Sequence, residues 1–227
     1  GGEGTSGEIK DVAGWRIDDV VALLRGAANT QVRLEDQRAK SETITVPAAA
    51  GQPARRIGVV KLPGFYQDFE ARRRNEDDYA SATKDVAKML AQFRAQKVDG
   101  VVLDLRNNGG GSLGEAIELT GLFIDQGPVV QQRESGGRVQ VYSDRSPGVA
   151  WDGPLAVLVN RGSASASEIF AGAMQDYGRG VVIGQETYGK GTVQNLYPLD
   201  RYALGQDPNY GQLTVTIGMY YRVTGDS

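Results

Sequence analysis

Apolar residues along this chain alternate between short β-branched runs and longer stretches with the spacing of an amphipathic helix. The short runs predict strands at residues 57–62, 98–105, 129–132, 138–142, 155–159, 181–184 and 213–221, and residues 193–198 are also strand-like. Helical spacing predicts helices at residues 67–97, 113–124 and 165–176. Strands separated by helices are typical of an α/β domain with a largely parallel or mixed central sheet and flanking helices.

The region before residue 57 has a different pattern. A glycine- and serine-rich start precedes a predicted helix that ends at Gly26 and a predicted strand at residues 31–35. One helix and one strand are too little for a core of their own. Residues 36–56 are polar with a stretch of small residues, which favours a linker. We therefore divide the chain into an N-terminal part at residues 1–35, a linker at 36–56 and a core at 57–227.

The charge of the chain is nearly balanced. Its 227 residues include 25 Lys plus Arg and 28 Asp plus Glu, for a formal net charge of −3. This balance gives no reason to expect a nucleic-acid partner. No run of about 18 apolar residues exists, so we expect membrane association only through parts absent from this sequence. The chain begins with Gly1 instead of Met, from which we expect a fragment of a longer protein.

The composition contains no His and no Cys. Their absence excludes, within this sequence, a Ser-His-Asp triad, a His-ligated zinc site, a Cys nucleophile and a disulfide. Covalent catalysis in this chain would have to use Ser, Thr, Lys, Tyr or a carboxylate. We predict neither a metal nor an organic cofactor.

A glycine-rich segment from Asp104 to Gly114 lies directly after a predicted strand and before a predicted helix. Gly109, Gly111 and Gly114 formally satisfy the dinucleotide fingerprint G-x-G-x-x-G. However, two asparagines separate the strand from the first glycine, and the only acidic candidate, Glu134, does not close a second strand. A tight turn is one alternative interpretation. Half of an oxyanion hole, built from exposed backbone amides, is another.

The segment from Gly184 to Thr192 comes close to the phosphate-binding pattern G-x-x-x-x-G-K-[ST], but Gly191 stands where the Ser or Thr should be. A strand-like run follows instead of the helix that such a loop requires, which disfavours an NTPase. Lys190 lies between two glycines that allow close backbone approach. Burial of its ammonium would favour the neutral amine, which can act as a base. The alternative is an ordinary exposed lysine.

Alternating Ser and Ala residues at 163–167 connect a predicted strand to a predicted helix. Helix capping explains part of this run, because Ser163 or Ser165 can cap the helix and Glu168 completes a capping box from Ser165. Capping does not explain all of it. Small residues at a helix entry also let a hydroxyl and the following amide face a substrate carbonyl together, as nucleophilic acyl transfer requires.

Several motifs together resemble the carboxyl-terminal processing peptidases, and most closely the tail-specific bacterial members of that family. They are Leu62-Pro63-Gly64-Phe65-Tyr66, Asp104 to Gly111, Ser163 to Phe170, Thr187 to Gln194 and the closing run from Tyr221 to Gly225. The resemblance covers about residues 14–227 in order. It implies a mixed-sheet α/β protease core of the crotonase/Clp-like ββα type with flanking helices.

The resemblance also implies a serine endopeptidase with a Ser–Lys dyad and an acyl-enzyme, which suits a chain without histidine. Ser165 matches the nucleophile of the family, Lys190 the general base and Gln194 the residue that orients the lysine. The amides of Ala166 and Gly110 match the oxyanion hole.

Residues 15–35 resemble the last helix and strand of a PDZ domain, which in this family binds substrate C-termini by strand addition. The carboxylate-binding loop and the first strands of such a domain are missing, and Gln185 replaces a glutamate that relatives often have. The resemblance implies protein or peptide substrates with an apolar C-terminal tail, an adaptor protein as a further partner, and a bacterial periplasmic location.

Some alternatives stay open on the sequence alone. Ser163 and Ser167 are rival nucleophiles. A catalytically silent scaffold that binds C-terminal peptides on the same fold is the main functional alternative. A nucleotide-binding enzyme that uses both glycine motifs is a third possibility.

Overall fold

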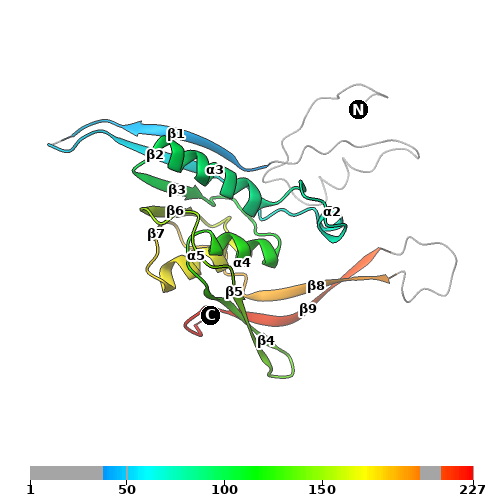
Figure 1. Cartoon of the computed structure of the whole chain (residues 1–227). Coiled ribbons are helices and arrows are strands. Elements are labelled where there is room, and N and C mark those ends of the chain that lie inside the picture. The colour runs from blue at the N-terminus through cyan, green and yellow to red at the C-terminus, as the bar shows by residue number, and fades with distance from the viewer. Residues whose placement is uncertain (1–37, 50, 200–210, 227) are drawn as a thin grey trace, which may run out of the picture. The chain divides into compact units, whose positions relative to one another are not determined.

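The computed structural model describes residues 38–49, 51–199 and 211–226 (Figure 1). The helix and strand predicted within residues 15–35, and with them the PDZ remnant, lie outside the described residues. Contacts divide the chain into two units, and residues 38–227 form the second of them. None of the helices in the described ranges is long and apolar enough to cross a membrane.

A five-stranded mixed sheet has the strand order β1-β2-β3-β6-β7. Its members are β1 (Lys40–Val46), β2 (Arg55–Lys61), β3 (Gly100–Asp104), β6 (Leu155–Val159) and β7 (Val181–Gly184). The β1 strand pairs with β2 in antiparallel fashion, whereas β2, β3, β6 and β7 run parallel. The prediction of a mixed α/β sheet is confirmed. Parallel strands end at the same edge of a sheet, so the loops after β3, β6 and β7 leave from one edge.

The β1 strand lies inside the segment that we predicted as a linker, residues 36–56. All seven of its residues are exposed, and Ile44 and Val46 are its only large apolar side chains. Backbone pairing with β2 holds this strand, with little burial of side chains. The hydrophobic pattern therefore did not indicate it, and residues 40–46 are a strand and not a linker.

The helices of the described ranges are α2 (Phe69–Arg73), α3 (Ala82–Gln96), α4 (Leu113–Gly121) and α5 (Ala166–Asp176). The single helix predicted at residues 67–97 is wrong, because this region contains two helices. Asp68 and Ser81 each begin a helix by accepting hydrogen bonds from backbone amides of its first turn. Between them, Asn75 has a φ of 55°, which ends α2. The helices predicted at residues 113–124 and 165–176 are confirmed with slightly different ends.

Burial alternates along the central strands. In β6 the side chains of Leu155, Val157 and Val159 are buried, whereas the two residues between them are partly exposed. The buried side chains join a hydrophobic core with residues of α3, α4 and α5. The other face of the sheet is only partly covered by the described residues, and on the edge strand β7 Val181 is 63% and Ile183 50% exposed.

A second, antiparallel sheet has the strand order β5-β4-β9-β8. Its members are β4 (Gly127–Glu134), β5 (Val139–Asp144), β8 (Thr192–Pro198) and β9 (Gln212–Tyr221). The hairpin predicted from residues 129–132 and 138–142 is confirmed as β4 and β5. Its pairing with β9 was not predicted, since the sequence indicated only one central sheet. Because β8 follows the loop that carries Lys190, this second sheet also determines where Gln194 lies.

Candidate active site

Ser165 is the last residue before α5, in the turn that follows β6. Its φ of 56° lies in the left-handed region, which is strained for a residue other than glycine. A strained serine between a strand and a helix is the arrangement that exposes a nucleophilic hydroxyl in many acyl-transfer enzymes. The local backbone is therefore compatible with a nucleophile at this position.

The three serines of the run differ in what their hydroxyls contact. Ser163 is fully buried, and its hydroxyl donates to the carbonyl of Leu105 at 2.8 Å. Ser167 is also fully buried, and its hydroxyl donates to the carbonyl of Asn108 at 2.9 Å. Ser165 is partly exposed. Of the three, Ser165 has the hydroxyl that a substrate could reach.

The carboxylate of Glu168 joins the serine turn to the loop that carries Lys190. It accepts a hydrogen bond from the Ser165 amide at 2.7 Å, which is one half of the predicted capping box. The same carboxylate accepts from the amides of Gly189 at 2.6 Å and Lys190 at 3.0 Å. Hydrogen bonds to an ionised carboxylate are stronger than neutral ones. One side chain thus fixes the spacing between the backbones of Ser165 and Lys190.

Lys190 lies in the loop between β7 and β8 and is partly buried. Its ammonium donates to Oε1 of Gln194 at 3.4 Å. The loop is also tied to the serine run, because the Tyr188 amide donates to the Ser163 carbonyl at 3.0 Å. Across the described residues, the side chains of Ser165 and Lys190 make no hydrogen bond with each other. The structure thus places the Lys190 ammonium beside the side chain of Gln194. Lys190 and Ser165 are linked only by the backbone hydrogen bonds that each donates to the carboxylate of Glu168.

The glycine loop after β3 packs directly on the serine turn. A Cβ atom on Gly110 would lie 2.8 Å from the Cβ of Ser165 and 3.1 Å from the amide nitrogen of Ala166, so a side chain does not fit there. The Gly110 amide donates to Oδ1 of Asn108 at 2.9 Å, and it must leave this partner before it can bind an oxyanion. The amide of Ala166 is the first of α5 and has no carbonyl partner inside the helix.

Asn108 is completely buried and connects the glycine loop to the serine run. Its side-chain amide donates to the carbonyl of Leu62 at 2.9 Å, while its Oδ1 binds the Gly110 amide. Its own carbonyl accepts from the amide of Ala164 at 3.0 Å and from the hydroxyl of Ser167 at 2.9 Å. This one residue therefore sets how the two loops meet.

Sequence reasoning missed the roles of Asn108 and Glu168. The available indication for Asn108 was its place between a strand and three glycines, which we interpreted only as an argument against a dinucleotide site. Glu168 was predicted as a helix cap. No local pattern indicates that a capping residue also binds a loop 21 residues later.

An ion pair between Asp104 and Arg106 holds the end of β3, just before the glycine loop. Arg106 donates to Asp104 with its backbone amide at 3.0 Å and with two guanidinium nitrogens at 2.9 and 2.7 Å. Burial opposes ionisation of Asp104, but the hydrogen bonds from Arg106 outweigh it and lower the pKa of this carboxyl. Asp104 is therefore ionised at neutral pH and stabilises the turn that follows β3.

The two glycine motifs do not have the surroundings of nucleotide sites. The loop after Gly184 leads into the strand β8, as the sequence indicated, and not into a helix. In the other motif, a Cβ atom on Gly111 would lie 2.4 Å from the carbonyl oxygen of Phe65. Glycine is required at position 111 because the backbone there lies against the backbone of Phe65. In the part of the chain that the structure describes, no group of three or more acidic residues could hold a metal ion.

The sequence profile of peptidase family S41 matches residues 56–227. The chain belongs to peptidase family S41. The tail-specific protease of Haemophilus influenzae is 42% identical over an alignment that covers 98% of this S41 chain and 32% of that protein. The carboxyl-terminal-processing protease of Synechocystis sp. is 36% identical over an alignment that covers 81% of this chain and 43% of that protein.

A solved structure of a related S41 protein agrees with this assignment. The photosystem II D1 C-terminal processing protease matches with a TM-score of 0.66 and 29% identity, over 87% of this chain and 47% of that chain. The family resemblance inferred from the sequence motifs is confirmed. The chain spans less than half the length of each of these relatives.

Proposed function

We propose that this S41 chain is the catalytic core of a serine endopeptidase that cleaves proteins recognised through an apolar C-terminal tail. The reaction would use a dyad of Ser165 and Lys190 and an acyl-enzyme. The observation that carries the proposal is that Glu168 binds the backbones of both the partly exposed Ser165 and Lys190. The names of the two bacterial relatives support the reaction class.

In the proposed mechanism, the neutral amine of Lys190 takes the proton from the Ser165 hydroxyl, and the serine oxygen attacks the scissile carbonyl carbon. The amide of Ala166 stabilises the oxyanion, together with the amide of Gly110 once that amide leaves Asn108. The C–N bond then breaks, and Lys190 returns the proton to the leaving amine. Water, deprotonated by the same lysine, hydrolyses the ester and restores Ser165.

Gln194 would orient the base. Its Oε1 atom accepts from the Lys190 ammonium at 3.4 Å. A neutral amide directs the amine without adding the negative charge that would favour its protonated form. The hydrogen bond between Ser165 and Lys190 would then form in the substrate complex, since catalytic contacts often tighten only there.

We further infer tail recognition by residues 1–35 as a PDZ remnant, an adaptor protein as a partner, and a periplasmic location. The similarity to a bacterial tail-specific protease supports these proposals. For the core we propose the crotonase/Clp-like ββα organisation. The run of parallel strands with buried inner residues is compatible with it.

The test is cleavage of an unstructured protein that ends in an apolar tail, followed by mass spectrometry. We expect the full chain to cleave it, and Ser165→Ala and Lys190→Ala to give no fragments while they keep the wild-type melting temperature. Lys88→Ala is the matched control, because Lys88 is an exposed lysine whose side chain is 66% accessible. Cleavage at the wild-type rate by Ser165→Ala would remove Ser165 from its role.

The alternative function is a catalytically silent scaffold that binds C-terminal peptides. It is favoured by two observations: the Gly110 amide is already bonded, and Ser165 and Lys190 make no direct hydrogen bond in the described residues. A fluorophosphonate probe separates the two functions. Binding of a tail peptide without labelling supports the scaffold, whereas labelling that Ser165→Ala abolishes supports the peptidase.

A further inference from the structure

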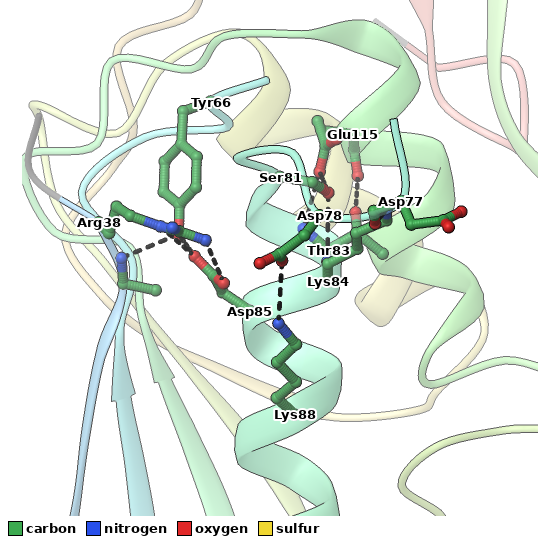
Figure 2. A network of polar contacts seen from close by, with 11 residues as sticks. Arg38, Tyr66, Asp77, Asp78, Ser81, Thr83, Lys84, Asp85, Lys88 and Glu115 are labelled. Atoms are coloured by element: carbon green, nitrogen blue, oxygen red, sulfur yellow. Dashed lines mark hydrogen bonds and ion pairs between the residues drawn. The ribbon is translucent and has the colours of Figure 1, made fainter. Parts of the chain in front are cut away.

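A polar network joins Arg38 and Ala39, the first described residues, to the segment of residues 65–67, and Figure 2 shows the part of this network around Tyr66. At its centre lies Asp85 of α3, which is 9% exposed. Its Oδ2 accepts from the Tyr66 hydroxyl at 2.5 Å and from Nε of Arg38 at 2.8 Å, and its Oδ1 accepts from Nη2 of Arg38 at 2.6 Å. The Tyr66 oxygen in turn accepts from the Ala39 amide at 2.9 Å. The Tyr66 hydroxyl therefore links the carboxylate of Asp85 to the backbone at Ala39.

The Tyr66 hydroxyl keeps its proton throughout the neutral pH range. Burial, and then the hydrogen bond to Asp85, raises the pKa of Tyr66 to about 12. The hydroxyl is therefore always a donor to Asp85, while its oxygen accepts from Ala39. Neither contact takes part in the chemistry proposed for Ser165 and Lys190.

A second buried carboxylate holds the next residue of the segment. Glu115 of α4 is fully buried, and its Oε1 accepts from the side-chain amide of Gln67 at 2.7 Å. Its Oε2 accepts from the Ser81 hydroxyl at 3.0 Å and the Thr83 amide at 2.7 Å, as Figure 2 shows. Residues 66 and 67 are thus fixed by carboxylates from two different helices.

Phe65, the first residue of the segment, holds the glycine loop with its backbone. Its amide donates to the Gly110 carbonyl at 2.9 Å, and its carbonyl accepts from the Ser112 amide at 2.8 Å. Phe65 is 1% exposed, so its place in the core is also fixed by packing. Gly110 in turn packs against Ser165 without room for a Cβ atom. A shift of residues 65–67 therefore moves the Gly110 peptide relative to Ser165.

We propose that Tyr66 is a positioning residue for the oxyanion-binding loop: its hydroxyl, held by Asp85, keeps Phe65 and therefore Gly110 in register with Ser165. This inference rests on the proposed peptidase function. Displacement of a catalytic group by about 1 Å can cost about 100-fold in rate, and loss of an oxyanion-hole donor costs a similar factor. Since Tyr66 acts through Phe65, we expect removal of its hydroxyl to cost about tenfold.

The test compares Tyr66→Phe with Tyr142→Phe in the full chain. Each substitution removes one partly buried hydroxyl, and that of Tyr142 donates to Gln132 in the second sheet at 3.0 Å. With a fluorophosphonate probe, we expect the maximal labelling rate of Tyr66→Phe to fall about tenfold while the half-saturating probe concentration stays unchanged. Tyr142→Phe should label like the wild type. Both melting temperatures should fall, because each variant loses one hydrogen bond.

The outcomes separate this inference from the proposed function. A wild-type labelling rate in Tyr66→Phe, with a melting temperature lowered as in the control, would overturn the inference and leave the peptidase proposal intact. Absence of labelling in the wild type would overturn both. If Tyr66→Phe does not fold, Asp85→Asn is measured instead, because it weakens the same contact and keeps the side-chain shape. A rate within about twofold of wild type in that variant would then overturn the inference.

Discussion

The three serines before and within the first turn of α5 have two different roles, set by what their hydroxyls contact. Ser163 and Ser167 tie the serine run to the loop after β3, because they donate to the carbonyls of Leu105 and Asn108. Each carbonyl also accepts from a backbone amide, so loss of the serine hydroxyl costs about the 1 kcal/mol of one hydrogen bond. Ser165 instead occupies a strained backbone conformation with its side chain partly exposed. Stability and chemistry are therefore divided between neighbouring residues of one type.

Ser163→Ala and Ser167→Ala should destabilise the protein without changing its reactivity. Each removes a buried hydrogen bond, so we expect the free energy of unfolding to fall by about 1–2 kcal/mol in a urea titration. Probe labelling should stay within a few-fold of wild type. Ser165→Ala should show the reverse, with nearly wild-type stability and no labelling. Loss of labelling in Ser167→Ala at unchanged stability would reassign the nucleophile.

The sequence alone indicated that the serine run is a candidate site. Only the family resemblance or the fold indicates which of its three hydroxyls is the nucleophile. The carbonyls that accept hydrogen bonds from Ser163 and Ser167 belong to residues 58 and 59 positions earlier in the sequence. Local periodicity contains no information about contacts at such a separation. The same reason explains why the role of Asn108 was missed.

At the scale of elements, Glu168 connects α5 to the loop between β7 and β8, so its loss should affect both. In Glu168→Gln the single amide oxygen cannot serve the three backbone amides, and the new NH₂ group faces other donors. We expect the free energy of unfolding to fall by about 2 kcal/mol in urea. The labelling rate should fall at least about tenfold, because Lys190 loses its fixed distance from Ser165.

Glu118→Gln is the matched control for this prediction. Glu118 of α4 pairs with Arg72 at 2.7 Å, and both side chains are 41% exposed. Exposed ion pairs contribute little, so the free energy of unfolding should change by less than about 1 kcal/mol. The labelling rate should not change. Equal effects of the two substitutions would show that Glu168 does not connect the two elements in the way we infer.

Elements were predicted well where apolar residues dominate and poorly where polar side chains act locally. The limits of β6 match the prediction at both ends, because every one of its residues is apolar. The break between α2 and α3 was missed, since the capping roles of Asp68 and Ser81 compete with helical spacing. The β1 strand was missed because it is held by backbone pairing and buries almost no apolar surface.

At the scale of the whole molecule, the second sheet is the part of the architecture that the pattern did not predict. Its strands β4 and β9 pair although β5, β6, α5, β7 and β8 all lie between them in the sequence. Each strand was recognisable by itself, but strand pairing at long range depends on register and packing that no local window contains.

The global stability should depend on the Tyr66 hydroxyl at alkaline pH. The pKa of Tyr66 rises from 10.0 to about 12 through burial and its bond to Asp85. Below pH 10 the hydroxyl is protonated in both the folded and the unfolded state, so its contribution is complete. Between about pH 10 and 12 the unfolded chain loses this proton more readily, so the contribution declines as the pH rises. The stability difference between wild type and Tyr66→Phe should therefore shrink over this range in urea titrations, and a constant difference would contradict the prediction.

Association between molecules should depend on β7, the edge strand of the central sheet. Neighbouring side chains of the edge strand β7 point to opposite faces: Ile183 is 50% exposed, whereas Val182 packs against the core. Ile183→Lys should change the free energy of unfolding by less than about 0.5 kcal/mol and lower light scattering of concentrated protein, since a charge on an apolar edge strand disfavours edge-to-edge pairing. Val182→Lys should instead cost about 2 kcal/mol, because it replaces a partly buried side chain that packs against the core with a charged one. Scattering of Ile183→Lys equal to that of wild type would show that this edge strand does not drive association.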